Sequence, residues 1–254
     1  MTAPRILRPA WPAPPGVCAA VTTRNGGASR GPWASFNLGD HVDDDPAAVQ
    51  ANRASLTAAL ALPNPPQWLR QVHGAETVAA AADVRARTGD SAWTRSPGVV
   101  CAVQSADCLP VLLCDRAGSV VAAVHGGWRG LAAGVIARAV AAMAVPAGEL
   151  LAWLGPAICP ACYEVGDEVR AAFTAVPGAA PADALAACFA PSGRAGHWRA
   201  DLPGIARAQL AGLGVSAGAI HGGDLCTFED PERFYSHRRD GVTGRMAALI
   251  WRES

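Results

Sequence analysis

The chain has 254 residues, 51% of them hydrophobic and 17% charged, so it is long and apolar enough to fold around a sizeable core. Its 21 Lys and Arg balance its 21 Asp and Glu, which excludes the broad basic surface typical of proteins that bind nucleic acid or anionic membranes. No uninterrupted apolar run reaches the ~18 residues of a membrane span, and the start carries no export signal. We therefore expect a cytoplasmic protein with reduced cysteines and without nucleic-acid or membrane partners.

The first part of the chain predicts an irregular start, one strand and one helix. Residues 1–15 are punctuated by proline, which predicts an irregular N-terminal arm. Val17–Thr22 predicts a short strand that runs into a Gly-rich loop at residues 23–29. Three acidic residues followed by Pro46 predict a helix start, and that helix ends near Leu60.

Two less regular stretches come next. Residues 68–74 alternate in polarity, which predicts a strand with Gln71 and His73 on the same face. Residues 80–97 are polar and contain Thr-Gly-Asp, which predicts an exposed loop.

The central stretch carries two short polar segments inside apolar sequence, SADC at residues 105–108 and HGGWRG at residues 125–130. The sequence between them is almost wholly apolar, except for a DRAG turn, and therefore predicts an antiparallel hairpin. Cys108 lies just before the first strand of this hairpin and His125 ends the second. The hairpin therefore brings a thiol and an imidazole together.

The rest of the chain predicts three helices, two strands and one long loop. The predicted helices cover residues 129–145, 166–174 and 201–213, and the predicted strands cover Leu150–Leu154 and residues 246–251. Residues 176–199 are rich in Ala, Pro and Gly, which predicts a long loop. The sequence shows no internal repeat and no domain boundary, so we expect one domain over residues 1–254.

His73, Cys108 and His125 are the strongest candidate site. Two His and one Cys suit tetrahedral zinc and leave one position open, as in catalytic zinc sites. The same set is compatible with copper. The spacing leaves two other interpretations open: a Cys/His nucleophile–base pair, and three unconnected structural residues.

Several arginines flank Gly-rich turns or helix ends, where a guanidinium can hold phosphate or carboxylate with two hydrogen bonds. These are Arg24, Arg53, Arg129, Arg238 and Arg239. For any single one of them, ordinary surface salt bridging is the favoured explanation. Cys159 and Cys162 form a C-x-x-C motif, which raises a thiol–disulfide oxidoreductase as an alternative.

A set of long motifs in fixed order resembles a known family. The motifs are TTRNGGAS, SFNLGDHV, ANRASL, WLRQVHG, SADCLPVLLCD, VHGGWRGLAAGV, WLGPAICPACYEVGDEV, DLPGIARAQL and CTFEDPERFYSHRRDGVTGRMAALIW. They are similar to the YfiH-type family, whose members are described as multicopper polyphenol oxidases (laccase domain), purine nucleoside phosphorylases and peptidoglycan editing factors. The resemblance covers roughly residues 15–252.

The resemblance implies a single α/β (α+β) domain, a mixed β-sheet core flanked by helices, similar to a bacterial deamidase-toxin fold. It implies zinc on His73, Cys108 and His125, and a monomer that acts on purine nucleosides. The implied reactions are phosphorolysis of adenosine, inosine and methylthioadenosine, and deamination of adenosine.

The resemblance also implies roles for further residues. It implies phosphate contacts at Arg24 and Arg53, and pocket residues at Asn37, Gln71, Cys162 and Arg238. The family usually has Gly at Cys159 and Tyr at His237, so on this resemblance the C-x-x-C motif is accidental and Cys162 is the thiol that matters.

In the mechanism that we expect, zinc activates water for deamination, and phosphate held by arginine attacks the ribose C1′ in phosphorolysis. Asp107 or a cysteine gives the departing base its proton, which makes Cys108, His125 and Asp107 the candidate catalytic residues. The alternatives are an amidase that edits misbuilt peptidoglycan precursors through the same residues, a copper phenol oxidase, and a non-catalytic metal-binding protein. With six His and no His-x-His pair, the chain lacks the ligands of a multicopper oxidase.

Overall fold

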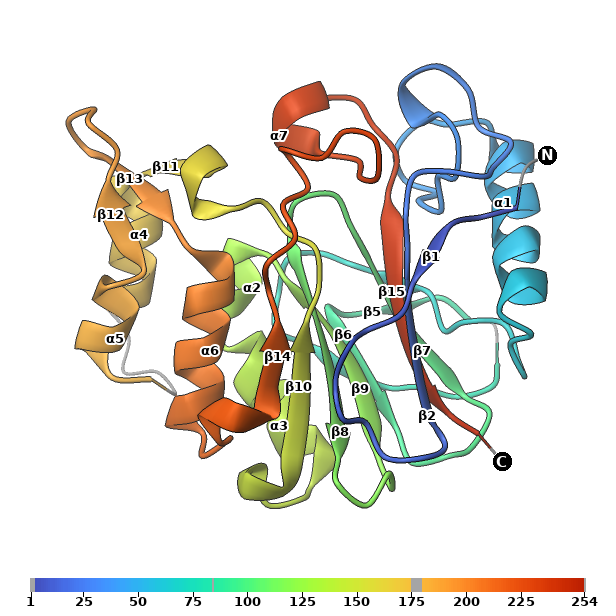
Figure 1. Cartoon of the computed structure of the whole chain (residues 1–254), viewed down its shortest axis with the longest axis horizontal. Coiled ribbons are helices and arrows are strands. Elements are labelled where there is room, and N and C mark those ends of the chain that lie inside the picture. Colours follow the sequence, from blue (N-terminus) through green and yellow to red (C-terminus); the bar gives the residue numbers. More distant parts are fainter. Residues whose placement is uncertain (1–2, 84, 175–179, 254) are drawn as a thin grey trace.

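The structure, a computed structural model, describes residues 3–83, 85–174 and 180–253. Two β-sheets pack face to face, with helices on both outer sides (Figure 1). In spatial order the larger sheet contains β14 (Ile220–Gly222), β10 (Leu150–Leu154), β8 (Leu109–Asp115), β9 (Val121–Gly126), β6 (Ser91–Thr94) and β4 (Thr77–Ala79). The smaller sheet contains β1 (Ile6–Leu7), β2 (Val17–Thr22), β15 (Met246–Arg252) and β7 (Val100–Ser105).

Strands of the smaller sheet are buried on both faces, which explains their continuous apolar sequence. In β15, Ala248 and Ile250 belong to the core between the sheets, whereas Ala247 and Leu249 belong to a second core under the first helix. This alternation follows from the two-residue period of a strand. The larger sheet is mixed, because β14 and β4 pair in parallel with their neighbours and the other pairs are antiparallel.

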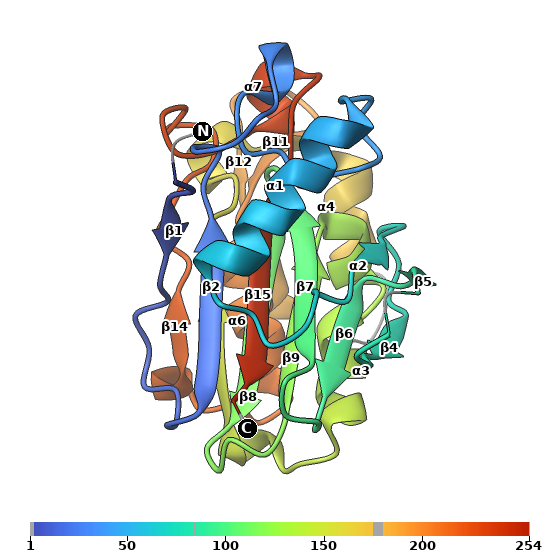
Figure 2. The same ribbon diagram turned by 90° about the vertical axis from the view of Figure 1, so that its right-hand side faces the viewer.

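Three helices cover the two sheets. Helix α1 (Pro46–Ala59) crosses the outer face of the smaller sheet (Figure 2) and begins at Asp45, whose carboxylate accepts a hydrogen bond from the backbone N–H of Ala47. Helix α3 (Val135–Met143) packs on β9 and β6, and α6 (Leu202–Gly212) packs on α3. No helix in the described part of the chain is long and apolar enough to cross a membrane.

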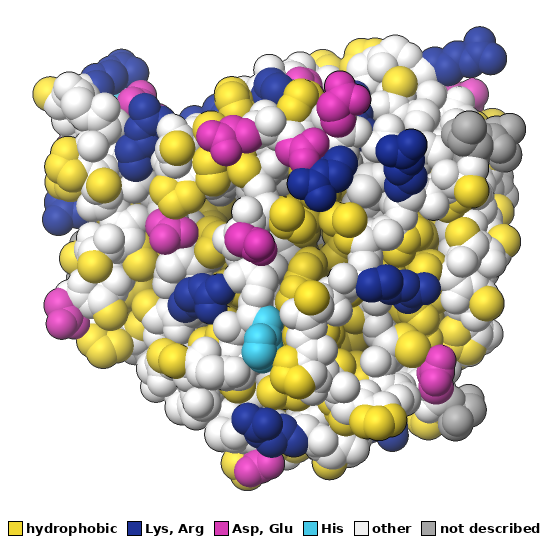
Figure 3. Space-filling model, viewed as in Figure 1, with side chains coloured by type: hydrophobic (Ala, Val, Ile, Leu, Met, Phe, Trp, Pro, Cys, Tyr) yellow, Lys and Arg dark blue, Asp and Glu magenta, His cyan; other side chains and the backbone are white. Residues whose placement is uncertain are grey.

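The remaining elements are short. They are α2 (Trp128–Ala132), α4 (Asp167–Thr174), α5 (Ala182–Ala186) and α7 (His237–Asp240), the 3-10 turns η1 (Gly31–Trp33), η2 (Ala147–Glu149), η3 (Pro160–Cys162) and η4 (Ala217–Ala219), a sheet of β11 (Glu164–Gly166), β13 (His197–Ala200) and β12 (Phe189–Pro191), and the pair β3 (Leu69–Arg70) and β5 (Arg87–Thr88). On the face in Figure 3, acidic and basic side chains are interspersed, in keeping with the balanced composition.

The predicted α/β class, with a mixed β core flanked by helices, is confirmed. So are the strands at Val17–Thr22 and Leu150–Leu154, the central hairpin, the closing strand, and the helices near residues 46–60, 166–174 and 201–213.

The prediction of an exposed loop at residues 80–97 is wrong over residues 87–94, whereas the described residues of this stretch before them form no helix or strand and are mostly exposed. Strand β6 lies in this stretch and pairs with both β4 and β9. Its polar residues are buried because they have partners: the hydroxyls of Ser91 and Thr77 lie 2.7 Å apart, within hydrogen-bond distance. Strand β6 has only four residues, and two of them, Ser91 and Thr94, carry hydroxyls, so its sequence gives too little apolar pattern to predict a strand.

Four other boundaries also differ from the prediction. The strand at residues 68–74 ends at Arg70, and His73 lies in a turn with a φ of 57°. The helix at residues 129–145 is two helices, because Gly134 adopts a φ of 83° between them. The arm at residues 1–15 contains β1. The loop at residues 176–199 lies partly outside the described residues, and its described part contains α5, β12 and β13.

Candidate metal centre

Four strand ends meet at the candidate centre. Cys108 directly precedes β8, and His125 lies on β9, where it pairs with Pro110. Asp90 directly precedes β6, the other neighbour of β9, and His73 lies in the loop between β3 and β4. The hairpin therefore brings Cys108 and His125 together, as the sequence predicts.

His73, Cys108 and His125 are close enough to share one ion. One ligand atom from each lies within 4.8 Å of the others, and Cys108 Sγ is 3.8 Å from His73 Nε2. Tetrahedral zinc, at ~2.0 Å from nitrogen and ~2.3 Å from sulfur, places its donors roughly 3.5 Å apart. Small side-chain rotations are enough to close this difference, so the donor set fits zinc.

The centre opens toward solvent on one side. His125 is buried, Cys108 is half-buried and His73 is exposed. Gly127 lies directly beside the three donors, where a Cβ would come 2.9 Å from His73 Cδ2 and 3.1 Å from Cys108 Sγ. The glycine therefore leaves the room that an ion and its ligands need.

Asp90 fixes two of the three donors, and sequence reasoning missed it. Its Oδ1 accepts hydrogen bonds from Nδ1 of His125 and from the backbone N–H of His73, both at 2.9 Å. Its Oδ2 accepts from the backbone N–H groups of Val72 at 3.1 Å and Gly74 at 2.7 Å. Because Nδ1 of His125 donates to this carboxylate, Nε2 keeps its lone pair for a metal, which is the usual arrangement of a metal-binding histidine.

The electrostatics of the three residues follow from this geometry. Burial by itself raises the pKa of Cys108, but the charge of His125 and hydrogen bonds from His125 and His73 outweigh it and lower the pKa to about 6. Burial lowers the pKa of His125, but the charge of Cys108 and the hydrogen bond to Asp90 raise it to about 9. Without a metal, the thiolate–imidazolium form of this pair is therefore favoured at neutral pH.

Asp107, which precedes Cys108, accepts hydrogen bonds from residues of neighbouring loops. Its Oδ1 accepts a hydrogen bond from the hydroxyl of Thr227 at 2.6 Å, and its Oδ2 accepts from the backbone N–H of Arg238 at 2.7 Å. Its carbonyl oxygen accepts from the backbone N–H of Ile158 at 3.0 Å. Both carboxylate oxygens already have partners, so proton donation by Asp107 would cost one of these hydrogen bonds.

A cavity of about 370 Å³ is linked to the centre through the backbone, although none of the three donors lines it. Trp128 and Arg129 of its lining follow Gly127 along the chain, and the backbone N–H of Arg238, another lining residue, donates to Asp107. The lining includes Tyr163, whose pKa is raised by burial. The other lining residues are Glu164, Val165, Gly166, Glu168, Val169, Arg194, His197 and Arg238. Three of these residues are arginines and two are glutamates. Arg194 forms an ion pair with Glu164, and Arg238 donates to the carbonyl oxygen of Glu164 at 2.8 Å, so Arg129 is the arginine of this lining best placed to hold an added anionic group.

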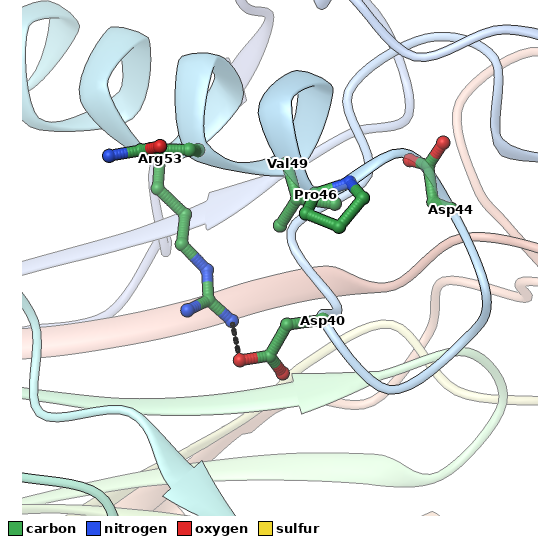
Figure 4. Close-up of a pocket in the computed structure, with 6 residues that line it drawn as sticks. Asp40, Asp44, Pro46, Val49 and Arg53 are labelled. Carbon is green, nitrogen blue, oxygen red and sulfur yellow. Dashed lines mark ion pairs between the residues drawn. The ribbon is translucent and has the colours of Figure 1, made fainter.

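The two arginines expected to contact phosphate both donate to backbone carbonyl oxygens, and a phosphate contact by either stays a prediction. Arg24 donates to the carbonyl oxygens of Ala34 at 3.2 Å and Pro231 at 3.1 Å. Arg53 donates to the carbonyl oxygen of Leu38 through Nε at 3.0 Å and Nη2 at 2.8 Å, and forms an ion pair with Asp40 (Figure 4).

The expected pocket residues are spread over several places. Arg238 lines the cavity. Gln71 is half-buried. Its side-chain oxygen accepts a hydrogen bond from the backbone N–H of Gln104 at 2.7 Å, and its side-chain NH₂ donates to the carbonyl oxygen of Gln104 at 2.8 Å. Asn37 is buried, and its oxygen accepts from the backbone N–H of Arg245 at 2.8 Å. Burial lowers the pKa of Arg245, an arginine that the sequence did not single out.

Cys162 lies in a different cluster. Its sulfur is near those of Cys159 and Cys226, and these three residues form the second group of potential metal ligands in the described part of the chain.

The chain is similar to known proteins along almost its whole length. The Pseudomonas aeruginosa protein named purine nucleoside phosphorylase PA4543 is 53% identical over 96% of this chain and 97% of its own. The Escherichia coli (strain K12) protein named purine nucleoside phosphorylase YfiH is 48% identical over 97% and 98%.

Solved structures agree with this similarity. Neisseria meningitidis protein NMB0706 superposes with a TM-score of 0.92 at 45% identity, over 98% of this chain and 99% of that one. YlmD from Geobacillus stearothermophilus superposes with a TM-score of 0.91 at 33% identity, over 100% and 98%. Residues 18–253 match the family described as multi-copper polyphenol oxidoreductase laccase, and the chain belongs to this family.

Proposed function

We propose that this chain is a zinc-dependent purine nucleoside phosphorylase. The observation that carries the proposal is that an open His-Cys-His group is linked through the backbone to a cavity lined by Arg129, Arg194 and Arg238. The names of the relatives at up to 53% identity support the same reaction.

Bound zinc would supply a Lewis acid that polarises a substrate group or lowers the pKa of a water molecule. The protein holds the ion through His73, Cys108 and His125, and Asp90 keeps His125 in the tautomer that can bind it. Holding nucleoside and phosphate in one cavity converts a reaction between separate molecules into one between positioned groups.

The cavity residues supply the other functions that phosphorolysis needs. Arg129 and Arg238 hold phosphate so that one of its oxygens bonds to C1′ of the ribose. The bond from C1′ to the purine nitrogen breaks, its electron pair goes to the base, and the base takes up the proton that the attacking hydrogen phosphate gives up. Tyr163 is neutral at physiological pH, as tyrosine ordinarily is, and burial raises its pKa further, so its hydroxyl can donate a hydrogen bond to the departing base.

Zinc fits this centre better than a set of coppers. A laccase uses a cluster of several coppers held by many histidines, and this chain has only six His in total. Two of them are in the His-Cys-His group, and the second group in the described residues contains only cysteine. The family's name therefore does not describe the chemistry of this donor set.

The same centre supports two further reactions. Adenosine deamination requires only activated water at the purine carbon that bears the amine. The amidase alternative is favoured by one observation, the lowered pKa of Cys108 beside His125, which gives a nucleophile and a base for peptidoglycan precursors.

The test is product analysis by chromatography after incubation of the zinc-loaded protein with adenosine, with and without phosphate. Free adenine formed only with phosphate supports phosphorolysis, and inosine formed in both incubations supports deamination. If adenosine stays intact in both, its deamination and its phosphorolysis are excluded, and a muramyl amino-acid substrate then tests the amidase alternative.

A further inference from the structure

Three cysteines outside the first centre lie within reach of one another. One sulfur each from Cys159, Cys162 and Cys226 lies within 4.8 Å of the others, and all three residues are half-buried free thiols. On the family resemblance, the C-x-x-C motif of Cys159 and Cys162 is expected to have no function as a pair. The structure adds a third sulfur to it from a distant part of the chain.

The backbone holds these sulfurs in place by pairing two loops. The loop after β10 and the loop after β14 run side by side (Figure 1), where Ala157 and Cys226 form a parallel β-bridge. The N–H of Ala157 donates to the carbonyl oxygen of Leu225 at 3.1 Å, and Thr227 N–H donates to that of Ala157 at 3.0 Å. This pairing sets Cys226 opposite the C-x-x-C turn.

The turn η3 brings the other two sulfurs to the same side. The backbone N–H of Cys162 donates to the carbonyl oxygen of Cys159 at 3.0 Å, which closes the turn. The N–H of Cys159 donates to the sulfur of Cys226 at 3.3 Å, a contact that stabilises a thiolate. The carboxylate of Glu229 lies 3.6 Å from the sulfur of Cys162 and adds an oxygen donor.

Two arginines hold the loops around this cluster. Arg239 donates to the carbonyl oxygens of Thr227 at 2.8 Å and Phe228 at 2.9 Å, and Arg199 donates to the carbonyl oxygen of Ala161. The charge of Arg199 offsets part of the negative charge that three thiolates and a carboxylate would bring together, whereas the charge of Arg239 is already paired with Asp240.

We infer that Cys159, Cys162 and Cys226 bind a second zinc ion, with the carboxylate of Glu229 as its fourth ligand. Thiolates are preferred ligands of zinc, and three thiolates with one carboxylate complete a tetrahedral site. A zinc–sulfur distance of ~2.3 Å places the sulfurs about 3.8 Å apart, so the cluster needs to contract by no more than roughly 1 Å.

The second ion would act as a structural clamp on the wall of the first centre. It would join the loop of Ile158 to the loop of Thr227. Both residues donate hydrogen bonds to Asp107, which directly precedes Cys108. Binding of the second ion does not require the reaction at the first centre, so it can be tested separately from the proposed phosphorylase activity.

The test isolates the second site by removing the first with Cys108→Ala. Protein purified with its thiols kept reduced is loaded with zinc, desalted and measured for metal by mass spectrometry. We expect the Cys108→Ala protein to hold one zinc per chain. The double variant Cys108→Ala/Cys226→Ser should hold none, and the control variant Cys108→Ala/Cys188→Ser should still hold one. Cys188 is also half-buried and free, but it lies outside both groups.

Two further readouts protect the test against misfolding. Cobalt bound to the Cys108→Ala protein should give an intense near-ultraviolet thiolate charge-transfer band, and zinc should raise the melting temperature of this protein. The inference is overturned if the Cys108→Ala protein holds no zinc and shows neither effect, or if folded Cys108→Ala/Cys226→Ser protein holds as much zinc as Cys108→Ala. The inference is also overturned if Cys159 and Cys162 form a disulfide in protein that was purified under reducing conditions and then treated with zinc.

Discussion

Asp90 and His125 are joined by a hydrogen bond of 2.9 Å between two buried side chains that lie 35 residues apart. The same carboxylate accepts the backbone N–H groups of residues 72, 73 and 74, so it also shapes the loop that presents His73. One side chain therefore sets the orientation of two of the three metal ligands.

Replacement of Asp90 by Asn should weaken zinc binding at the first centre by about 10- to 100-fold, because the carboxylate that orients His125 is lost. Chelator competition measures the affinity. Asp83→Asn is the control, since Asp83 lies on the surface in an ion pair with Arg87. Equal zinc affinity for Asp90→Asn and wild type would show that the carboxylate has no part in metal binding.

Cys108 should be the most reactive thiol of the metal-free protein. Its lowered pKa means that the thiolate is present above about pH 6 and is lost as the pH falls below that value. Iodoacetamide labelling followed by peptide mass spectrometry should give a half-maximal rate near pH 6. Cys188 provides the comparison, because burial raises its pKa to about 11. Equal labelling of both at pH 7 contradicts the geometry of the centre.

Gly127→Ala should remove zinc from the first centre without unfolding the protein. The new Cβ would lie 2.9 Å from His73 Cδ2 and 3.1 Å from Cys108 Sγ, which pushes two ligands apart. The matched control is Gly218→Ala, because a Cβ there meets nothing within 4 Å. Metal content and the melting temperature are measured together. Full zinc content in Gly127→Ala would mean that the ion lies elsewhere.

Arg129→Ala should raise the KM for phosphate roughly 10- to 150-fold, because one charged hydrogen bond is worth ~1.5–3 kcal/mol. Arg53→Ala should instead lower the free energy of unfolding by roughly 1–3 kcal/mol and leave that KM unchanged, since its guanidinium holds the carbonyl oxygen of Leu38. Steady-state kinetics and urea unfolding separate the two effects. The reverse outcome would return the phosphate site to Arg53, where the family resemblance placed it.

The sequence was sufficient to find His73, Cys108 and His125, and to predict the central hairpin. Cys108 and His125 lie at the ends of adjacent strands joined by a short turn, so local patterns predict their meeting. Asp90 was missed because β6 is short and pairs with strands that precede and follow it at some distance in the sequence. A carboxylate just before a strand that neighbours β9 becomes informative only when the order of the strands is known.

The arginines show a second limit of sequence reasoning. Arg53 and Arg129 have the same side chain, and both lie beside a helix or a Gly-rich turn. Which cavity a guanidinium lines, and which carbonyl oxygen it meets, depends on the packing of distant segments: Arg53 bonds Leu38 and lines one cavity, whereas Arg129 lines another. The same applies to Cys226, which lies 67 residues from Cys159 and is brought to it by the pairing of two loops.

The most direct test of the account is a zinc titration of the metal-free Cys159→Ser protein, in which only the first centre should remain. Phosphate-dependent release of hypoxanthine from inosine is followed at each zinc concentration. The account predicts that the rate rises with added zinc and reaches its plateau at one zinc per chain, and that adding Cys108→Ser abolishes it. A full rate in the metal-free protein, or in the variant with Cys108→Ser, would contradict the account.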